Sequence, residues 1–565
     1  MTKGLQKGLT TYGDPGFSLF LRKSFIKAMG FGDDPLSRPI VGITNTYSDY
    51  NPCHGNVPDL IESVKRGVML AGGLPMVFLT ISVAESFAHP TSMFLRNLLA
   101  MDTEEMIRAQ PMDSVVVIGG CDKNLPAQVM AAASADLPTV VLPTGPMLVG
   151  HHRGEVLGAC TDCRRFWAQH RAGLVDVAEI ELVSGRLCPS VGFCGVMGTA
   201  STMACLIEAL GLSLPMSATA PATHADRRRI AEASGKRAAE MAMIGSPRPK
   251  ELITAASVRN ASVVLQAIGG STNALIHLTG IAGRVGVSFD LAAFDQLGRD
   301  VPVIVNLKPS GSHYMEHFHN AGGMPAVLRE LAPMLDTGLP TVSGQPLASY
   351  IEQAEIVPNQ DVIRTLAAPL KCEGTMAVLH GNLAPRGAVI KQSAASPNLL
   401  RHIGRAVVFD SVQDMTERID LPDLDVTPDD ILVLRNAGPK GAPGMPEAGY
   451  LPIPMKLARQ GVKDMVRISD ARMSGTAFGS IVLHVAPESA VGGPLAVVQT
   501  GDRISLDIEA RRLDLLIDEP EIRRRLDAWR AAPPHRELST RGYARLFEEH
   551  ILQADEGCDF DFLRG

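Results

Sequence analysis

The segment from Ser114 to Met130, SVVVIGGCDKNLPAQVM, decides the fold class of this chain. Its apolar beginning, Val115 to Ile118, predicts a buried strand. A helix start follows, with Asn124 able to cap the helix and Pro126 in the first turn, where a missing N–H costs little. A second apolar run, Thr139 to Leu142, comes after the helix. The segment therefore predicts a strand–helix–strand unit, which is the repeating element of α/β folds with a parallel sheet.

The polar triplet Cys121-Asp122-Lys123 lies between that strand and that helix. In open α/β sheets, ligands bind at the carboxyl ends of the strands. A thiol, a carboxylate and an amine in succession at this edge form a candidate site for metal binding and proton transfer. A polar loop with an incidental cysteine is the alternative that this segment alone leaves open.

The composition is that of a globular protein, and it narrows the classes of partner. The chain has 565 residues, 45% of them hydrophobic and 20% charged, so we expect two or three domains. The net charge of −7 is spread along the chain without a basic face, which argues against a nucleic-acid partner. No apolar run could span a bilayer and no apolar signal core begins the chain, so we expect a cytoplasmic protein without membrane contact. Nine cysteines are too few for a disulfide scaffold and fit free thiols or metal ligands.

Two other loops carry residues suited to chemistry. A strand predicted from Ile40 to Thr44 leads into a polar loop that contains Cys53 and His54. A strand predicted from Met76 to Ile81 is followed by Glu85, which is either an exposed charge or a ligand for a hard cation.

Further cysteines follow in the N-terminal half. Cys194 precedes a helix predicted from Thr199 to Leu210, and a helix N-terminus favours a thiolate. Cys160 and Cys163 have the C-x-x-C spacing, but zinc sites usually need a second such pair and the sequence has none. We therefore assign these two cysteines to structure.

Cys53, Cys121 and Cys194 are far apart in the sequence, yet each lies in a loop rich in glycine or proline at the end of a predicted element. Three thiolates gathered by the fold would suit an iron–sulfur cluster. Three protein ligands in place of four would leave one iron open to substrate, where it acts as a Lewis acid.

A region rich in proline and glycine, at about residues 335–375, separates two parts of the chain with different patterns of predicted secondary structure. We therefore predict an N-terminal α/β domain at residues 1–370 and a C-terminal domain at residues 371–565. Short β-rich runs separated by turn residues fill the second part and predict a closed or nearly closed β-barrel. The runs are Met376–Leu379, Ala388–Lys391, Ala406–Phe409, Ile431–Leu434, Met465–Ile468, Ile481–Val485, Leu495–Val498 and Ile504–Ile508. A final helix is expected from about Glu521 to Trp529, on the outside of the barrel.

Several blocks in order resemble the signature blocks of the dihydroxy-acid/sugar-acid dehydratase family. They are CDKNLPAQVMAA, CPSVGFCGVMGTASTMACLIEALGLSLP, GGSTNA, GNLAPRGAVIK, GPKGAPGMPE, SDARMSGTAFG and HVAPESAVGGPLAVVQTGD. The resemblance spans about residues 35–515. SDARMSGTAFG, together with GMPEAGYLPIP, looks more like the arabinonate and xylonate dehydratases than like the branched-chain pathway enzyme. One departure is Ala127, where many members have glycine, and we expect it to affect packing only.

The resemblance implies an N-terminal α/β domain, a C-terminal β-barrel domain and a site between them near a dimer interface. It implies that a cluster is held by Cys53, Cys121 and Cys194, as [2Fe-2S] with [4Fe-4S] as the alternative. It also implies that Mg²⁺ is bound by Glu85, Asp122, Glu447 and Lys123, the last of which can be carbamylated in this family. The catalytic residues implied are the base Ser474, its neighbour Thr476, and Lys123.

The expected reaction is the removal of water from a 2,3-dihydroxy acid, such as L-arabinonate, D-xylonate or D-gluconate, to give a 2-keto-3-deoxy acid. The alternative within the family is dihydroxyisovalerate, which an apolar pocket would favour, whereas Thr46, His54 and Thr476 are polar candidates near the site. A non-catalytic iron–sulfur electron carrier or sensor would instead show a fourth cluster ligand and no need for Mg²⁺. A metal-free binding protein is the third alternative. We expect a homodimer or homotetramer.

Overall fold

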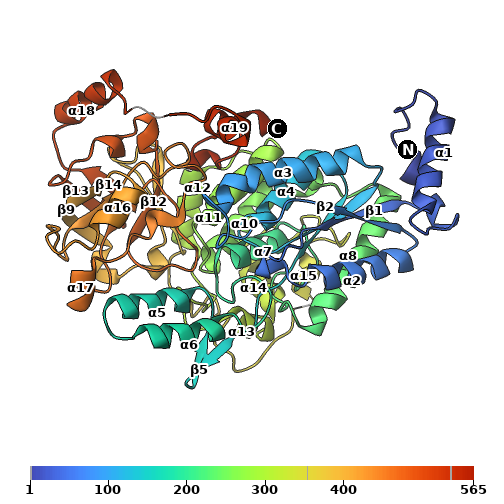
Figure 1. Cartoon of the computed structure of the whole chain (residues 1–565). Coiled ribbons are helices and arrows are strands. Elements are labelled where there is room, and N and C mark those ends of the chain that lie inside the picture. The colour runs from blue at the N-terminus through green and yellow to red at the C-terminus, as the bar shows by residue number, and fades with distance from the viewer. Residues whose placement is uncertain (1–2, 353, 535–536) are drawn as a thin grey trace.

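The parallel sheet of the N-terminal half has the order β2-β1-β3-β4 (Figure 1). Its strands are β1 (Ile40–Asn45), β2 (Leu74–Leu79), β3 (Ser114–Gly119) and β4 (Thr139–Pro143). β3 and β4 are buried along their whole length, which is why their sequences are continuous apolar runs and do not alternate. The computed structural model describes residues 3–352, 354–534 and 537–565.

Helices cover both faces of this sheet (Figure 1). On one face α2 (Val57–Leu70) packs along α8 (Ala225–Ile244), and on the other α3 (Ser92–Ala109) packs against α4 (Asn124–Ala135). The first pair approaches closely at two glycines. A Cβ on Gly67 would lie 1.9 Å from the Glu232 carbonyl oxygen, and a Cβ on Gly235 would lie 2.2 Å from that of Val64. Either methyl group would overlap the facing backbone, so the contact between these helices depends on glycine.

The predicted strand–helix–strand unit is present, but the predicted cap is wrong. α4 begins at Asn124, Lys123 occupies the capping position, and no side chain caps the helix. The Asn124 side chain instead bonds to Val83: its Oδ1 accepts the Val83 N–H at 3.2 Å, and its Nδ2 donates to the Val83 carbonyl. Asn124 therefore ties the start of α4 to the loop that carries Glu85.

The remaining elements of the first part surround this layer and extend toward the barrel. They are α1 (Pro15–Lys27), the hairpin β5 (Gly150–His152) and β6 (Glu155–Leu157), α5 (Thr161–Arg171), α6 (Val177–Leu187), α7 (Thr199–Ala209), α9 (Pro249–Leu252), α10 (Ala255–Ala267), α11 (Asn273–Arg284), α12 (Leu291–Asp300), α13 (Met315–Asn320), α14 (Gly323–Leu331) and α15 (Ala348–Glu352). Short 3-10 turns lie at Gly4–Gln6, Pro35–Ser37, Pro52–His54 and Ala332–Met334. α7 fulfils the prediction of a helix after Cys194.

In the described part of the C-terminal half, eight strands form a sheet in the order β14-β13-β9-β10-β11-β12-β8-β7. They are β7 (Ala377–Leu379), β8 (Gly387–Ile390), β9 (Arg401–Phe409), β10 (Ile431–Leu434), β11 (Arg467–Ser469), β12 (Ile481–Ala486), β13 (Arg503–Asp507) and β14 (Arg512–Leu515). β9 to β12 pair in parallel, and the others pair antiparallel. The ends of the sheet meet: the His380 N–H donates to the Arg511 carbonyl at 2.9 Å, and the Leu513 N–H donates to the His380 carbonyl at 3.0 Å. The predicted β-barrel is confirmed.

Period-two alternation separates the inside of the barrel from its outside. Ala406 and Val408 on β9 pack into the barrel core, whereas Val407 and Phe409 pack into a second core. α16 (Val412–Arg418) and α17 (Met455–Arg459) cover that second core. β9 is therefore apolar on both faces over these residues, as a strand between two cores must be.

Three details of the predicted C-terminal part differ from the structure. The run Leu495–Val498 is a 3-10 turn, Pro494–Val497, because Pro494 lacks the N–H that a ladder needs. β14 was not predicted. The predicted last helix is α18 (Glu519–Ala531), but α19 (Gly542–His550) follows it. Other 3-10 turns lie at Gln392–Ala394, Pro397–Leu399, Glu447–Gly449, Ser489–Val491, Ala554–Glu556 and Asp561–Leu563.

The domain boundary near residue 370 stays a prediction. The core of the first part reaches into the barrel, since Val378 of β7 and Val389 of β8 pack within it. Within residues 3–352, 354–534 and 537–565, no helix combines the length and the hydrophobicity needed to cross a membrane.

Candidate active site

Four thiols from separate loops lie together. Cys53 and Cys121 follow the neighbouring strands β1 and β3, and their thiols hydrogen-bond to each other. The Cys194 Sγ lies 3.6 Å from the Cys160 Sγ. Cys53 also interacts electrostatically with Cys160. The structure thus brings together the three cysteines that the sequence singled out. Their role as cluster ligands stays a prediction.

Cys160 lies within this group of thiols, and its assignment to structure stays a prediction. Hydrogen bonds from Cys163 and then Cys194 hold the pKa of Cys160 well below its usual value. Hydrogen bonding to Cys160, followed by burial, raises the pKa of Cys194, and hydrogen bonding to Cys121, followed by burial, raises that of Cys53. The C-x-x-C spacing gave no sign of this, because the partner thiol comes from the loop before α7.

His54 holds the loop that carries Cys121. Its Nε2 accepts the N–H groups of Gly120 and Cys121 at 2.9 and 3.2 Å, so its Nδ1 carries the proton and donates to the Thr46 carbonyl at 2.8 Å. Burial lowers the pKa of His54 to about 4, which keeps this neutral tautomer at neutral pH. Thr46 in turn donates to the Ile118 carbonyl. Both residues were candidates for substrate contact, but their polar atoms are already used by the backbone.

Lys123 lies at the centre of a group of carboxylates. Its side chain is fully buried, 3.6 Å from Asp122 Oδ2 and 3.9 Å from Glu85 Oε2. Within the described part of the chain, the Lys123 Nζ has no hydrogen-bond partner. A buried amine without hydrogen bonds is costly, so this geometry fits a site that takes up a further group at Lys123.

Arg472, which the sequence analysis missed, bridges the other carboxylates. Its guanidinium donates to Glu447 at 2.6 Å, to Glu85 at 3.0 Å and to the Thr91 hydroxyl at 2.6 Å. Burial alone would raise the pKa of Glu85, but Arg472, Lys123 and two hydroxyl donors hold it well below its usual value. For Glu447 burial prevails and the pKa is raised. The sequence signal for Arg472 was its position in the SDARMSG block, two residues before the predicted base Ser474.

Two buried carboxylates position the loop that carries Glu447. Asp470 accepts the N–H of Ala437, and Glu488 accepts the N–H groups of Lys440 and Gly441. Burial and the charge of Asp470 raise the pKa of Glu488 to about 7. The loop is thus held to the barrel at its first residues, and Glu447 reaches Arg472 from it.

Ser474 lies in the loop between β11 and β12, next to the Cys194 loop. The Ser474 and Thr476 hydroxyls are 2.8 Å apart. Thr161 donates to the Thr476 carbonyl at 3.0 Å, and the Arg164 Nε lies 3.5 Å from the Thr476 hydroxyl. A Cβ on Gly198, shortly after Cys194, would lie 2.9 Å from the Thr476 methyl. The barrel loop and the cysteine loop are therefore in contact.

Arg164 is a second residue that sequence reasoning did not single out. It lies beside Thr476, 3.9 Å from the Glu447 carboxylate and 4.8 Å from the centre of the Tyr450 ring. It comes from α5, directly after the C-x-x-C pair, and it gives this side of the site a polar and positively charged wall.

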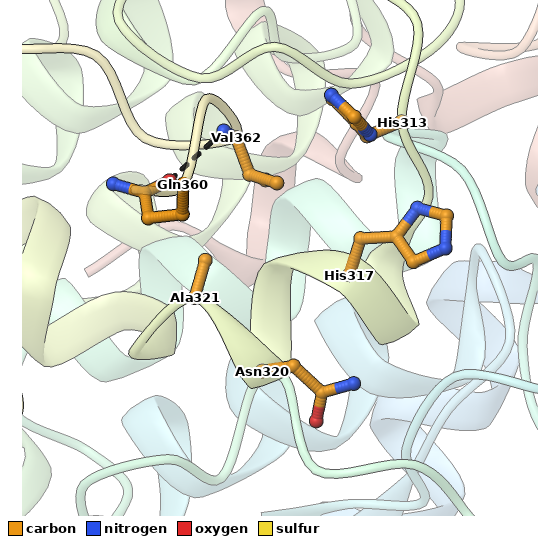
Figure 2. A pocket seen from close by; sticks show the side chains of 6 residues that line it. All are labelled: His313, His317, Asn320, Ala321, Gln360 and Val362. Atoms are coloured by element: carbon orange, nitrogen blue, oxygen red, sulfur yellow. Dashed lines mark hydrogen bonds between the residues drawn. The ribbon is translucent and has the colours of Figure 1, made fainter. Parts of the chain in front are cut away.

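A separate cavity of about 370 Å³ lies beside α13 (Figure 2). Its lining residues are His313, His317, Asn320, Ala321, Gln360 and Val362, with the Val362 N–H bonded to Gln360 Oε1 at 2.9 Å. The candidate site residues described above do not line it. The chemistry-bearing groups are instead buried between the sheet edge and the barrel loops.

Family models match nearly the whole chain: "Dihydroxy-acid/6-phosphogluconate dehydratase N-terminal" over residues 38–350, and its C-terminal counterpart over residues 361–558. The chain belongs to this dehydratase family. It is therefore an enzyme of the hydro-lyase class, and the predicted family and enzyme class are confirmed. The two matches also cover the α/β part and the barrel in turn.

Relatives in the family act on several acids. The chain is 48% identical to an L-arabonate dehydratase of Azospirillum brasilense, over 97% of this chain and 94% of the relative. It is 45% identical to a 6-deoxy-6-sulfo-D-gluconate dehydratase of Pseudomonas putida, over 94% and 91%. It is 39% identical to a dihydroxy-acid dehydratase of Moorella thermoacetica, over 95% and 97%. Sugar-acid and dihydroxy-acid dehydratases are thus both among its relatives.

Dehydratases of this family are generally iron–sulfur enzymes, and the donor atoms present fit such a group. Thiols are the ligands that select iron–sulfur clusters, and here they converge in a buried place. The carboxylates around Lys123 supply the oxygen ligands that Mg²⁺ prefers. The Lys123 Nζ, which has no hydrogen-bond partner among the described residues, is the observation that best fits a bound group there.

Proposed function

We propose that this enzyme dehydrates a 2,3-dihydroxy sugar acid, such as L-arabinonate, D-xylonate or D-gluconate, to the 2-keto-3-deoxy acid. One observation carries the proposal: the cysteine group, the carboxylates around Lys123 and the Ser474 loop all meet in one buried place. A dehydration needs these three elements, because the departing hydroxyl, the acid group and the C2 proton must be handled together.

Cys53, Cys121 and Cys194 would hold the cluster, which we propose to be [2Fe-2S], with [4Fe-4S] as the alternative. Glu85, Asp122 and Glu447 would hold Mg²⁺ together with Lys123 in its carbamylated form. When bound, the cluster supplies a Lewis acid for the departing hydroxyl, and Mg²⁺ supplies positive charge for the carboxylate and the C2 oxygen.

The chain's own residues handle the proton at C2. Ser474 Oγ, as the alkoxide that nearby positive charge favours, would accept this proton, and the Thr476 hydroxyl at 2.8 Å can donate a hydrogen bond to it. The electron pair of the C2–H bond forms the C2=C3 double bond as the C3–O bond breaks. The proton lost from C2 and the hydroxide lost from C3 together make one water molecule, so the step balances. The enol product then tautomerises to the 2-keto-3-deoxy acid.

Arg472 and Arg164 favour a charged and hydroxylated substrate. Arg472 neutralises Glu85 and Glu447, so that further anionic groups can approach. Arg164 presents a cation beside Thr476, where the remaining hydroxyls of a sugar acid can bond. The apolar branch of dihydroxyisovalerate would leave these groups without hydrogen-bond partners. A site built to hydrogen-bond its substrate binds such an analogue more weakly for this reason.

A substrate panel tests the proposal. Enzyme purified without oxygen and supplied with Mg²⁺ is assayed with L-arabinonate, D-xylonate, D-gluconate and dihydroxyisovalerate, and its iron and sulfide are measured. We expect turnover of at least one sugar acid well above that of dihydroxyisovalerate. Preference for dihydroxyisovalerate, or full activity in iron-free enzyme, would overturn the proposal.

Ser474→Ala tests the base separately. We expect the catalytic rate to fall by about 10²- to 10⁴-fold, the usual contribution of a positioned base, with the iron content unchanged. Ser271→Ala is the matched control: Ser271 packs against Gly475 from the GGSTNA turn, its hydroxyl bonds to Thr199, and the proposed mechanism gives it no proton to transfer. Near-normal turnover of Ser474→Ala with an intact cluster would require another base.

We also propose a homo-oligomer in the reducing cytoplasm, where free thiols persist. All nine cysteines are free in the structure, in keeping with such a compartment. α1 exposes Phe17, Phe20 and Phe25 to solvent at one edge of the molecule (Figure 1), a surface that a second copy of the chain could cover.

A further inference from the structure

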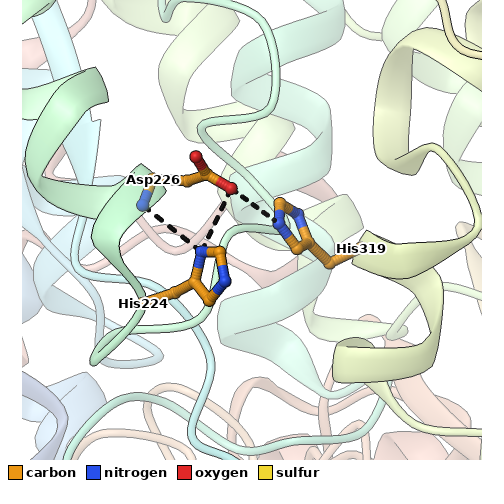
Figure 3. Close-up of side chains that lie close together, drawn as sticks. All are labelled: His224, Asp226 and His319. Atoms are coloured by element: carbon orange, nitrogen blue, oxygen red, sulfur yellow. Dashed lines mark hydrogen bonds and ion pairs between the residues drawn. The ribbon is translucent and has the colours of Figure 1, made fainter.

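Two histidines and an aspartate gather outside the proposed catalytic site. His224 precedes α8, Asp226 lies in the first turn of α8, and His319 lies on α13. Figure 3 shows the three side chains pointing toward one another. One donor atom from each lies within 4.8 Å of the other two. We propose that these residues form a binding site for a divalent transition metal of the zinc type.

The distances suit a shared ion. Asp226 Oδ2 lies 3.0 Å from His224 Nδ1 and 3.5 Å from His319 Nε2. Neighbouring ligands of a tetrahedral zinc site, with bonds near 2.0–2.1 Å, are about 3.3 Å apart. The His224 Nδ1 also accepts the Asp226 N–H at 3.3 Å, which keeps this nitrogen on the side of the aspartate. His224 is half-exposed, so its ring can turn to shorten the remaining edge of the site.

The surroundings prepare His319 to donate a lone pair. Its Nδ1 lies 3.3 Å from the Thr219 hydroxyl, which leaves Nε2 directed at the carboxylate. A bonded second nitrogen is usual for a histidine that binds a metal.

The carboxylate of Asp226 can serve both neighbours. Its Oδ1 pairs with Arg229, whereas its Oδ2 faces the two imidazoles. Two imidazoles and one carboxylate are a donor set for zinc and related ions, and an open site leaves a fourth position for water. His224 is exposed, so an ion can reach the site from solvent.

Such an ion would join two parts of the fold. α8 packs on the parallel sheet through β3 and β4, and α13 packs against α14. A bond from His319 to the start of α8 therefore links the sheet layer to the helices that lead toward the barrel. We assign the ion a structural role, because the site shares no residue with the proposed catalytic one.

Zinc binding to the cluster-loaded, Mg²⁺-saturated enzyme tests the proposal. We expect one zinc site per chain that raises the thermal midpoint. His224→Ala and His319→Ala should each bind zinc at least about tenfold more weakly and lose this rise, because each removes one of three protein ligands. His151→Ala, which removes an exposed histidine elsewhere, should behave as wild type.

Co²⁺ identifies the ligands. A site of nitrogen and oxygen ligands gives the visible bands of tetrahedral cobalt without the near-ultraviolet sulfur-to-cobalt transition, whereas binding to the cysteines gives that transition. Equal zinc affinity in wild type and both variants, or the sulfur transition in wild type, would overturn the proposal. His224→Ala changes an exposed side chain, so it decides the matter even where His319→Ala affects folding.

Discussion

Cys160 lies 3.6 Å from Cys194, where a fourth ligand of the proposed cluster would have to be. Four thiolates would close the cluster, and three would leave an iron open for substrate. Because the chain belongs to a dehydratase family, the alternative of a non-catalytic iron–sulfur carrier is excluded. What Cys160 leaves to be tested is which of the four thiols bind iron.

Cys160→Ser should keep its iron, and Cys194→Ser should lose most of it. Serine preserves the hydrogen bonds of Cys160 to Cys163 and Cys194 but cannot replace a thiolate ligand. Iron per chain and the electron paramagnetic resonance of the reduced enzyme measure the difference. If Cys160→Ser loses the cluster as readily as Cys194→Ser, the open-iron mechanism is wrong.

Lys391 gives a prediction of pH dependence. Its Nζ lies 3.5 Å from the Gly475 carbonyl, and burial lowers its pKa to about 7 from the usual 10.5. Between these values the unfolded chain binds the proton and the folded protein does not, so folding becomes more favourable as the pH rises. Relative to Lys391→Met, wild type should gain up to about 5 kcal/mol between about pH 7 and pH 10.5.

Denaturant midpoints of wild type and Lys391→Met at several pH values check this. Below about pH 7 the methionine variant should be the more stable, because wild type then buries a charge. Lys236→Met, at an exposed position of α8, serves as the control and should show no such trend. A pH-independent difference between wild type and Lys391→Met would contradict the prediction.

At the scale of elements, the α2–α8 contact depends on glycine more than on helix propensity. Gly67→Ala places a methyl group 1.9 Å from the Glu232 carbonyl oxygen, so the helices must separate. We expect a loss of at least about 2 kcal/mol of stability, since overpacking a rigid contact exceeds the gain of about 1 kcal/mol from alanine in a helix.

Gly185→Ala in α6 is the matched control for this substitution. Gly185 is also inside a helix, but its added methyl group would meet no atom within 4 Å, so alanine should be neutral or stabilising by up to about 1 kcal/mol. Thermal midpoints of the two variants separate packing from propensity. A stable Gly67→Ala variant would mean that α2 and α8 can move apart freely.

At the scale of the whole molecule, α1 predicts self-association. Phe20 and Phe25 are 63% and 74% exposed, which is unfavourable for an isolated chain in water. The double variant Phe20→Asp, Phe25→Asp should therefore shift the protein toward monomers in light scattering coupled to size exclusion. Leu174→Asp, at an exposed apolar residue after α5, should leave the oligomer unchanged. An unchanged mass for the α1 variant would place the contact between copies elsewhere.

The sequence by itself determined the layers of this protein and its family. Continuous apolar runs such as Val115–Ile118 predict strands buried on both faces, and short runs with turn residues predict the barrel, because periodicity and turn preference are local properties. The motif blocks were sufficient to identify the family. Pro494 marks where periodicity alone fails: the apolar run Leu495–Val498 was predicted as a strand, but with Pro494 it forms a 3-10 turn.

Only the tertiary structure decided which side chains meet. Cys160 lies beside Cys194, Arg472 bridges Glu85 and Glu447, and the polar atoms of His54 are used by the backbone. These contacts join loops that are hundreds of residues apart or come from different elements, and their geometry depends on how the sheet and barrel pack. Local sequence carries no record of such distances, so chemistry-bearing residues could be named from it, but their partners could not.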